Sequence, residues 1–93
     1  MYYKLLENYI NNKFSKEDII KFCAYENVKL SDNELSIFYS FIKKYWSYLL
    51  NGKEDTFFKL LKDKVSLDTY NTAIILYKKY IVYMNIYVYF YLF

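Results

Sequence analysis

This chain contains no histidine, arginine, glutamine or proline, and it has one cysteine, Cys23, and one glycine, Gly52. Most enzyme mechanisms use a group that titrates near neutral pH, a paired thiol, a glycine-rich phosphate loop or a guanidinium that grips an anion with two hydrogen bonds. None of these can be assembled from the residues present. The composition therefore argues against the common catalytic classes, and the scarcity of glycine and proline favours helices joined by short links.

Apolar and aromatic residues are abundant. Of the 93 residues, 56% are hydrophobic and 25% are aromatic, including 14 tyrosines and 8 phenylalanines. These fractions exceed ordinary globular usage, so the chain has enough apolar surface to fold as one small domain. The joint excess of Lys, Asn, Tyr, Phe and Ile is also what an AT-rich coding sequence produces. We take this bias as the main source of the tyrosine count, with a base-stacking or interfacial role as the alternative.

The charge is weakly positive and evenly spread, with 13 lysines, 10 acidic residues and a net charge of +3. Nucleic-acid-binding proteins normally gather their basic residues on one face. A single cysteine excludes an intramolecular disulfide and a cysteine-based metal cage. The first twenty residues hold no apolar run of signal-peptide length. These features predict a cytoplasmic protein with no cofactor and no metal.

The strongest local pattern is a helix that starts at Ser31. The residues from Ser31 to Glu34 (SDNE) form a capping box, in which the serine hydroxyl accepts from the third helical amide and Glu34 returns to the amide of the cap residue. Apolar residues then recur every three or four positions. Gly52 supplies a left-handed residue that ends the segment. The pattern predicts a helix over 32–50.

Three or four further helices are expected around this one. Ser15 begins a helix over 16–25, and apolar residues within 5–10 predict a helix before it. Apolar residues within 57–61 predict a fourth helix, and Ser66 caps a fifth. We therefore predict an all-α fold, a small bundle of four to five short helices. The predicted core residues are Ile19, Ile20, Phe22, Leu35, Phe38, Ile42, Trp46, Leu60, Leu61 and Ile74.

The end of the chain differs from the rest, because residues 81–93 carry no charge and a single amide, Asn85. A bilayer-spanning helix needs about 20 apolar residues, and extending this segment backwards would bring Lys78 and Lys79 into the span. Three interpretations stay open: a last helix continued on the bundle, contact with a membrane surface or a second copy, and a poorly ordered terminus. We divide the chain into a helical domain, 1–80, and an aromatic tail, 81–93.

The acidic residues and the cysteine have structural explanations. The acidic pairs at the predicted helix starts are Glu17 with Asp18, Asp32 with Glu34, and Glu54 with Asp55. Free amides and the helix dipole stabilise carboxylates at such positions. Cys23 lies among apolar residues with no histidine to activate it, so we expect a small buried side chain. The sequence predicts no catalytic residue and no metal ligand.

The helices over 16–25 and 32–50 have roughly the layout of a helix-turn-helix. However, the turn lacks glycine, and no arginine is present to bind guanine. The second helix also opens with acidic residues where phosphates would lie. Weak, nonspecific nucleic-acid contact is therefore the third of three functional interpretations.

Contact with a protein is the first interpretation, because a small bundle cannot bury this many aromatic side chains and exposed aromatic patches commonly form interfaces. The expected partner is another protein or a second copy of this chain, with no small-molecule substrate. The second interpretation is a peripheral membrane protein, with the tail tyrosines and the nearby lysines at the bilayer surface. The candidate interaction surface comprises Lys43, Lys44, Tyr45, Lys78, Lys79, Tyr83, Tyr87, Tyr89, Tyr91 and Phe93.

Three segments follow a spacing that is known from other proteins: FSKEDIIKFC at 14–23, YENVKLS at 25–31, and Val65-Ser66 leading to Thr72-Ala73. Over residues 8–80 this pattern resembles the YqfT-like domain of unknown function, a family of short proteins from low-GC Gram-positive bacteria. The chain departs from that pattern in its link WSYLLNGKE, its aromatic tail and a missing arginine. The resemblance implies a small cytosolic helical protein and brings no catalytic or ligand residue with it.

Overall fold

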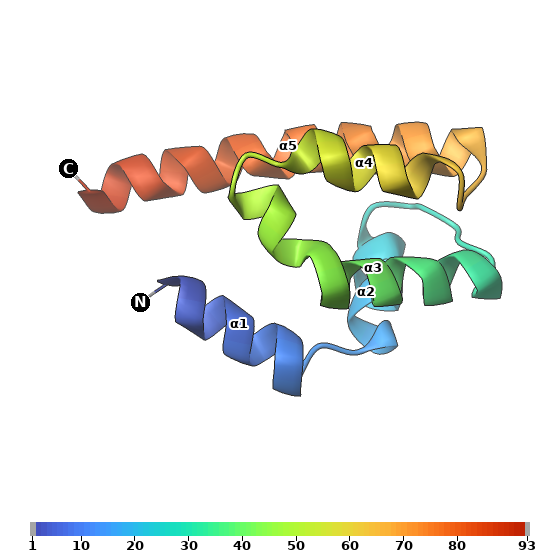
Figure 1. Ribbon diagram of the computed structural model, residues 1–93, viewed down its shortest axis with the longest axis horizontal. Coiled ribbons are helices and arrows are strands. Elements are labelled where there is room, and N and C mark those ends of the chain that lie inside the picture. Colours follow the sequence, from blue (N-terminus) through green and yellow to red (C-terminus); the bar gives the residue numbers. More distant parts are fainter. Residues whose placement is uncertain (1, 93) are drawn as a thin grey trace.

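A computed structural model describes the backbone of residues 2–92 and the side chains of residues 3–81. Five helices follow one another along this backbone, with no strand among the residues described: α1 (Tyr2–Asn12), α2 (Lys16–Tyr25), α3 (Asp32–Leu50), α4 (Glu54–Lys62) and α5 (Leu67–Leu92) (Figure 1). The predicted all-α fold is confirmed. The helices that the sequence predicts over 16–25 and 32–50 have those same bounds in α2 and α3.

The central helix of the fold is α3, which contacts α1, α2 and α4. The first part of α5 lies along α4, and α1 and α2 lie on the other side of the molecule (Figure 1). Within the described residues, the backbones of α2 and α5 do not approach each other closely. Contacts across the space between these two helices are therefore made by side chains and not by a close approach of the backbones.

The helix ends follow the predicted caps. The Ser31 hydroxyl accepts from the backbone N–H of Glu34 at 3.1 Å, and the Ser66 hydroxyl accepts from the N–H of Thr69 at 3.2 Å. Gly52 separates α3 from α4 with a φ of +74°. This left-handed conformation is adopted by glycine without the steric cost that a Cβ brings. The breaks between the later helices thus have local causes.

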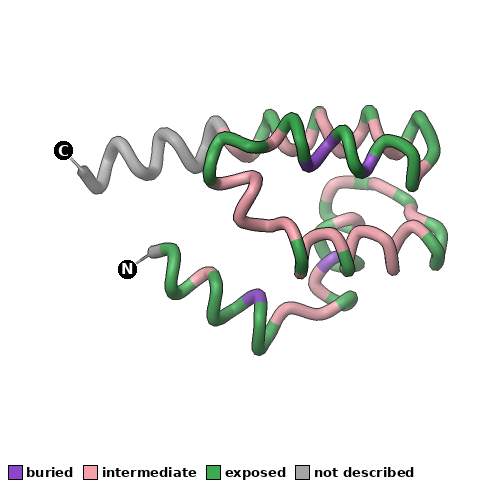
Figure 2. The backbone as a smooth tube through the Cα atoms, in the orientation of Figure 1, coloured by how far each residue is buried: buried purple, intermediate pink, exposed green. Residues whose placement is uncertain are grey.

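The buried core is centred on α4, whose Phe57, Phe58 and Leu61 form one cluster. The buried parts of the backbone are purple in Figure 2. Leu61 is fully buried. The ring of Phe57 meets Phe41 of α3 edge-on, with 5.9 Å between ring centroids, and Phe58 lies 5.4 Å from Tyr77 of α5. A single face of α4 thereby joins α3 to α5.

Part of the predicted core is wrong: Ile20, Phe22 and Leu60 are 45%, 40% and 43% exposed. Neighbouring residues on a helix differ in direction by about 100°, so the burial of Ile19 and Leu61 turns Ile20 and Leu60 away from the core. Ile19 and Leu61 are confirmed as buried. The other five predicted core residues, Leu35, Phe38, Ile42, Trp46 and Ile74, are half-buried. The buried residues that the sequence analysis did not choose are Ile10, Phe57 and Phe58.

The described residues include no helix with both the length and the apolar character that crossing a bilayer requires. The backbone of α5 continues as a helix to Leu92. The side chains from 82 onwards lie outside the described residues, so the contacts of the tail stay a prediction.

Candidate functional site

The first three residues of the predicted interaction surface are Lys43, Lys44 and Tyr45, and the structure brings only the last two together. The Lys43 ammonium lies 5.7 Å from the centroid of the Tyr39 ring, whereas the Lys44 ammonium lies 5.2 Å from the Tyr45 ring. Tyr45 is half-buried and packs against the core cluster. Lys43 and Lys44 therefore pack over different rings, so the structure does not bring the three residues together as one exposed patch.

Two of these residues do meet in a shallow hollow between α3 and α4, which we call the α3–α4 depression. It has a volume of about 300 Å³ and is lined by Ser40, Phe41, Lys44, Tyr45, Leu60 and Lys64. Leu60 is 43% exposed, and both lysines are exposed. The depression thus combines accessible apolar side chains with two positive charges.

The lysines of α5 have different surroundings. Lys78 is exposed, and the Lys79 ammonium lies 3.2 Å from a carboxylate oxygen of Glu26, next to the end of α2. The Tyr80 hydroxyl also donates a hydrogen bond to Glu26. Lys79 is therefore part of a bridge between α2 and α5. The remaining predicted residues, Tyr83, Tyr87, Tyr89, Tyr91 and Phe93, lie outside the described side chains.

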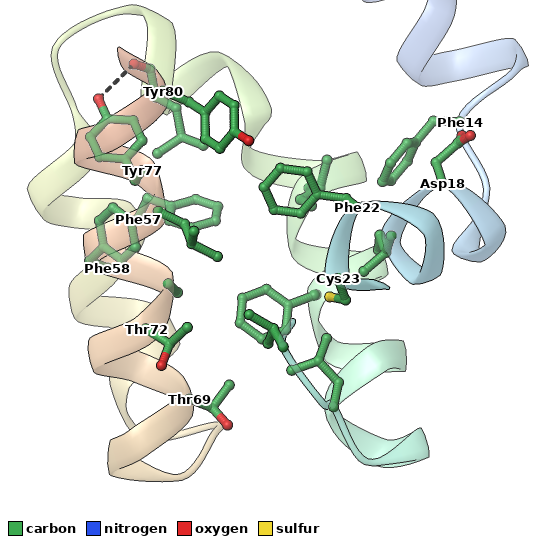
Figure 3. Close-up of a pocket in the computed structure, with 18 residues that line it drawn as sticks. Phe14, Asp18, Phe22, Cys23, Phe57, Phe58, Thr69, Thr72, Tyr77 and Tyr80 are labelled. Atoms are coloured by element: carbon green, nitrogen blue, oxygen red, sulfur yellow. Dashed lines mark hydrogen bonds between the residues drawn. The ribbon is translucent and has the colours of Figure 1, made fainter. Parts of the chain in front are cut away.

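A larger hollow lies between α2 and α5, with a volume of about 440 Å³; we call it the interhelical groove (Figure 3). Its two walls are apolar stripes at helical spacing. The wall from α2 is formed by Ile19, Phe22 and Cys23, and the wall from α5 includes Ala73, Leu76 and Tyr80. Phe57 and Phe58 of α4 also line it. The groove is thus an apolar space that reaches the buried core.

Among the described residues, three polar links join α5 to α3 or to the end of α2. One is the hydrogen bond that the Tyr77 hydroxyl donates to the Leu49 carbonyl oxygen at 3.3 Å (Figure 3). The other two, which we call the bridges, lie one at each end of the groove. At one end Glu26 binds Lys79 and Tyr80. At the other end, the Glu34 carboxylate accepts from the backbone N–H of Ser66 at 3.0 Å and from the Thr69 hydroxyl at 3.1 Å. Thr69 and Tyr80 are the first and last residues of α5 on the groove lining.

The bridge from Glu34 corrects one detail of the capping box. The sequence predicted that this carboxylate accepts a hydrogen bond from the backbone amide of Ser31, at the start of the same helix. The carboxylate instead binds the N-terminal end of α5, where free amides attract a negative charge. A capping motif that looks local in the sequence thereby makes a tertiary contact.

Replacing Glu34 by alanine is expected to lower the free energy of unfolding by about 1 to 2 kcal/mol, because it removes a charged acceptor from two donors of α5. Urea unfolding followed by circular dichroism measures the change. Asp32→Ala is the matched control, since Asp32 is an exposed acid in the same helical turn. We expect its effect to stay within about 0.5 kcal/mol. Equal effects of the two variants would contradict a bridge to α5.

The pKa of the Glu26 carboxyl is lowered by the hydrogen bond from Tyr80 and by the ammonium of Lys79, although partial burial opposes this. A lowered pKa stabilises the fold above the ordinary glutamate value of about 4.3, and that stabilisation is lost as the pH falls through the lower pKa of the folded state. We therefore expect the melting temperature to fall between about pH 6 and about pH 3.

Glu26→Gln is expected to show a smaller fall in melting temperature over the same interval, because its amide has no proton to gain. The variant keeps some acid sensitivity, since the Ser15 amide and the Tyr9 hydroxyl lower the pKa of Asp18 in the same direction. Scanning calorimetry at both pH values measures the difference. Parallel curves for the two proteins would show that ionisation of Glu26 does not contribute to the acid sensitivity.

Cys23, predicted from the sequence to be buried, is only half-buried, because it lies on the wall of the groove. Its partial burial raises the pKa of the thiol. A raised pKa keeps the sulfur protonated and weakly nucleophilic. Among the described side chains, no three of the His, Cys, Asp and Glu type come close enough to hold a metal ion. The described lining of the groove is therefore mostly apolar and carries one weakly nucleophilic thiol.

Sequence reasoning missed Leu60 and Lys64 as surface residues. Leu60 and Leu61 lie three and four residues after Phe57, so the spacing did not show which of the two leucines faces the core. The interhelical groove had no comparable signal, because its walls belong to helices about 50 residues apart.

Comparisons with protein-family models, with curated proteins and with solved structures find no match to this chain. The resemblance to the YqfT-like family stays a prediction. The functional inference therefore depends on the surfaces of this chain alone.

Proposed function

We propose that this chain is a noncatalytic protein that acts by binding another protein at the α3–α4 depression. One observation supports this most directly: Leu60 is 43% exposed in a hollow that it shares with the aromatic rings of Phe41 and Tyr45. An apolar side chain of a partner protein can bury accessible apolar side chains of this kind when they lie in a concave site.

The charge of the depression favours an acidic partner segment. Among the described residues, Lys44 and Lys64 line it and no acidic residue does. Both side chains are exposed, so their ammonium groups can meet carboxylates at the rim of a contact whose centre is apolar. The expected partner segment carries leucine or phenylalanine together with aspartate or glutamate.

The same charge disfavours a symmetric dimer through this surface. In a two-fold dimer the same patch lies on both sides of the interface. Lys44 and Lys64 of both copies would then lie in one interface, and like charges brought close together weaken association. A different protein is therefore the partner proposed here, and self-association is an outcome of the test.

Site-specific photo-crosslinking tests the proposal. Benzoylphenylalanine placed at position 60 of the full chain is irradiated in the cells that express it, and crosslinked peptides are identified by mass spectrometry. The expected product joins position 60 to an acidic, apolar segment of another protein. The same amino acid at Ile75, which is 66% exposed on α5, serves as the positional control and should not yield that product.

Charge reversal tests the role of the lysines. The double variant Lys44→Glu/Lys64→Glu should lose at least tenfold in crosslink yield, because two attractive contacts become repulsive. Lys59→Glu makes a charge change at an exposed position of α4 outside the depression and should retain the product. Crosslinks only to a second copy, to a basic segment, or with equal yield in both variants would refute the proposal.

A further inference from the structure

We infer that the interhelical groove binds a single-chain aliphatic carboxylate, with the hydrocarbon chain between α2 and α5 and the carboxylate beside Lys79. The ligand is held without covalent change. This inference concerns a different surface from the α3–α4 depression and goes beyond the proposed protein contact.

The groove has the size and lining of a site for a small apolar ligand. Its volume of about 440 Å³ lies within the usual range for ligand pockets, which are mostly apolar with a few polar groups. Apolar side chains from α2, α3, α4 and α5 line it. Between Thr69 and Tyr80 the α5 wall is about 16 Å long by the rise of a helix. This shape matches an extended hydrocarbon chain.

The two bridges argue against a helix of another protein as the occupant. A helix with its side chains is about 10–12 Å wide. To lie along the groove it would have to pass through the direct hydrogen bonds of Glu26 with Tyr80 and of Glu34 with Thr69. A hydrocarbon chain is far thinner, so it can occupy the apolar space while both bridges stay closed.

The charges at the ends of the groove indicate where a headgroup lies and which sign it has. Lys79 itself is not on the lining, but it precedes Tyr80, the last lining residue of α5. Its side chain is 49% exposed, whereas that of its partner Glu26 is only 9% exposed, so Lys79 is accessible to a second carboxylate at the end of the groove. The acid on the lining, Asp18, already accepts from Tyr9 and from the Ser15 amide, each at 2.9 Å. Charge complementarity therefore favours an anionic headgroup at the Lys79 end.

The first experiment varies the ligand. Hexanoate, octanoate and decanoate, each below its micellar concentration, are titrated into the full chain by calorimetry. We expect the dissociation constant to fall about fourfold for each added methylene until the chain fills the groove. Decanol and decyltrimethylammonium should bind more weakly than decanoate. Decanoate should also slow alkylation of Cys23, the only thiol of the chain, because that side chain lines the groove.

The second experiment varies the protein. Thr72→Phe adds a ring to the groove wall and should weaken decanoate binding at least tenfold, while Ile75→Phe, on the exposed side of the same helix, should leave it unchanged. Lys79→Gln should remove the preference for decanoate over decanol. Lys78→Gln carries the same charge change without loss of the bridge and should keep the preference. Lys78 and Lys79 are both exposed, so we expect their glutamine variants to fold. These two variants therefore test the site even if Thr72→Phe does not fold.

Several results would overturn the inference: an affinity independent of chain length, tighter binding of the cationic amphiphile, or unchanged binding to a folded Thr72→Phe variant. Binding to phosphatidylglycerol vesicles without any binding of free decanoate would also overturn the inference. That result would indicate that the chain binds a membrane surface and not a single aliphatic carboxylate. The Lys44→Glu/Lys64→Glu variant should bind decanoate normally, which separates this site from the proposed protein contact.

Discussion

Leu61→Ala is expected to lower the free energy of unfolding by about 3 to 5 kcal/mol, the upper part of the range for such truncations. The side chain is fully buried between Phe57 and Phe58 of α4 and the helices that pack on them. Its removal leaves a cavity at the point where α3 and α5 are joined through α4. Since a domain of this length has a total stability of about 5 to 14 kcal/mol, the loss is a large part of the whole. Urea unfolding followed by far-ultraviolet circular dichroism measures it.

Leu60→Ala provides the matched control, because it makes the same chemical change one residue earlier at a side chain that is 43% exposed. Its expected cost is below about 1 kcal/mol. If Leu61→Ala does not fold at all, Leu61→Met keeps most of the buried volume and should cost less than about 1.5 kcal/mol. Similar costs for the two alanine variants would show that the buried face of α4 is assigned wrongly.

Ile19→Ala is expected to cost about 2 to 4 kcal/mol, because Ile19 is the buried residue of α2. It is 7% exposed and lies on the face of α2 that lines the interhelical groove. Truncation would remove the main apolar anchor of α2 on the rest of the bundle. Amide hydrogen exchange followed by mass spectrometry should show faster exchange in 16–25 than in α4, in addition to the lower overall stability.

Ile20→Ala is the control for this second prediction, since Ile20 is 45% exposed. Its expected cost is within about 1 kcal/mol, with unchanged exchange in α2. A larger cost for Ile20 than for Ile19 would favour the other face of α2 as the packing face. The pair therefore tests the orientation of the helix directly.

Helix bounds were predictable because they depend on contacts a few residues apart. The hydroxyl of Ser31 reaches an amide three residues ahead, and Gly52 adopts its left-handed conformation within a single turn. Such interactions can be read from sequence without knowing where any other helix lies. Histidine-based chemistry and an intramolecular disulfide can also be excluded from the sequence, because the chain has no histidine and one cysteine.

The two surfaces were less predictable, because each combines residues from separate helices. Lys44 and Tyr45 were chosen for their position on one helix, but the depression that contains them also needs Leu60 and Lys64 from another. Leu60 was placed in the core on hydrophobicity, and only the direction of its side chain on α4 shows that it is accessible. Hydrophobicity alone does not distinguish a core residue from an exposed one.

The all-helical fold, the bounds of α2 and α3, and the caps that begin α3 and α5 could all be predicted from the sequence, because they follow from hydrogen bonds and side-chain spacing within one or two turns. The long-range partners could not: the Glu34 carboxylate binds Ser66 and Thr69, more than thirty residues away, and Glu26 binds Lys79 and Tyr80. Those partners depend on how α5 packs against α4 and α3. That packing is set by the shape of the buried Phe57, Phe58 and Leu61 cluster, which a one-dimensional pattern does not contain.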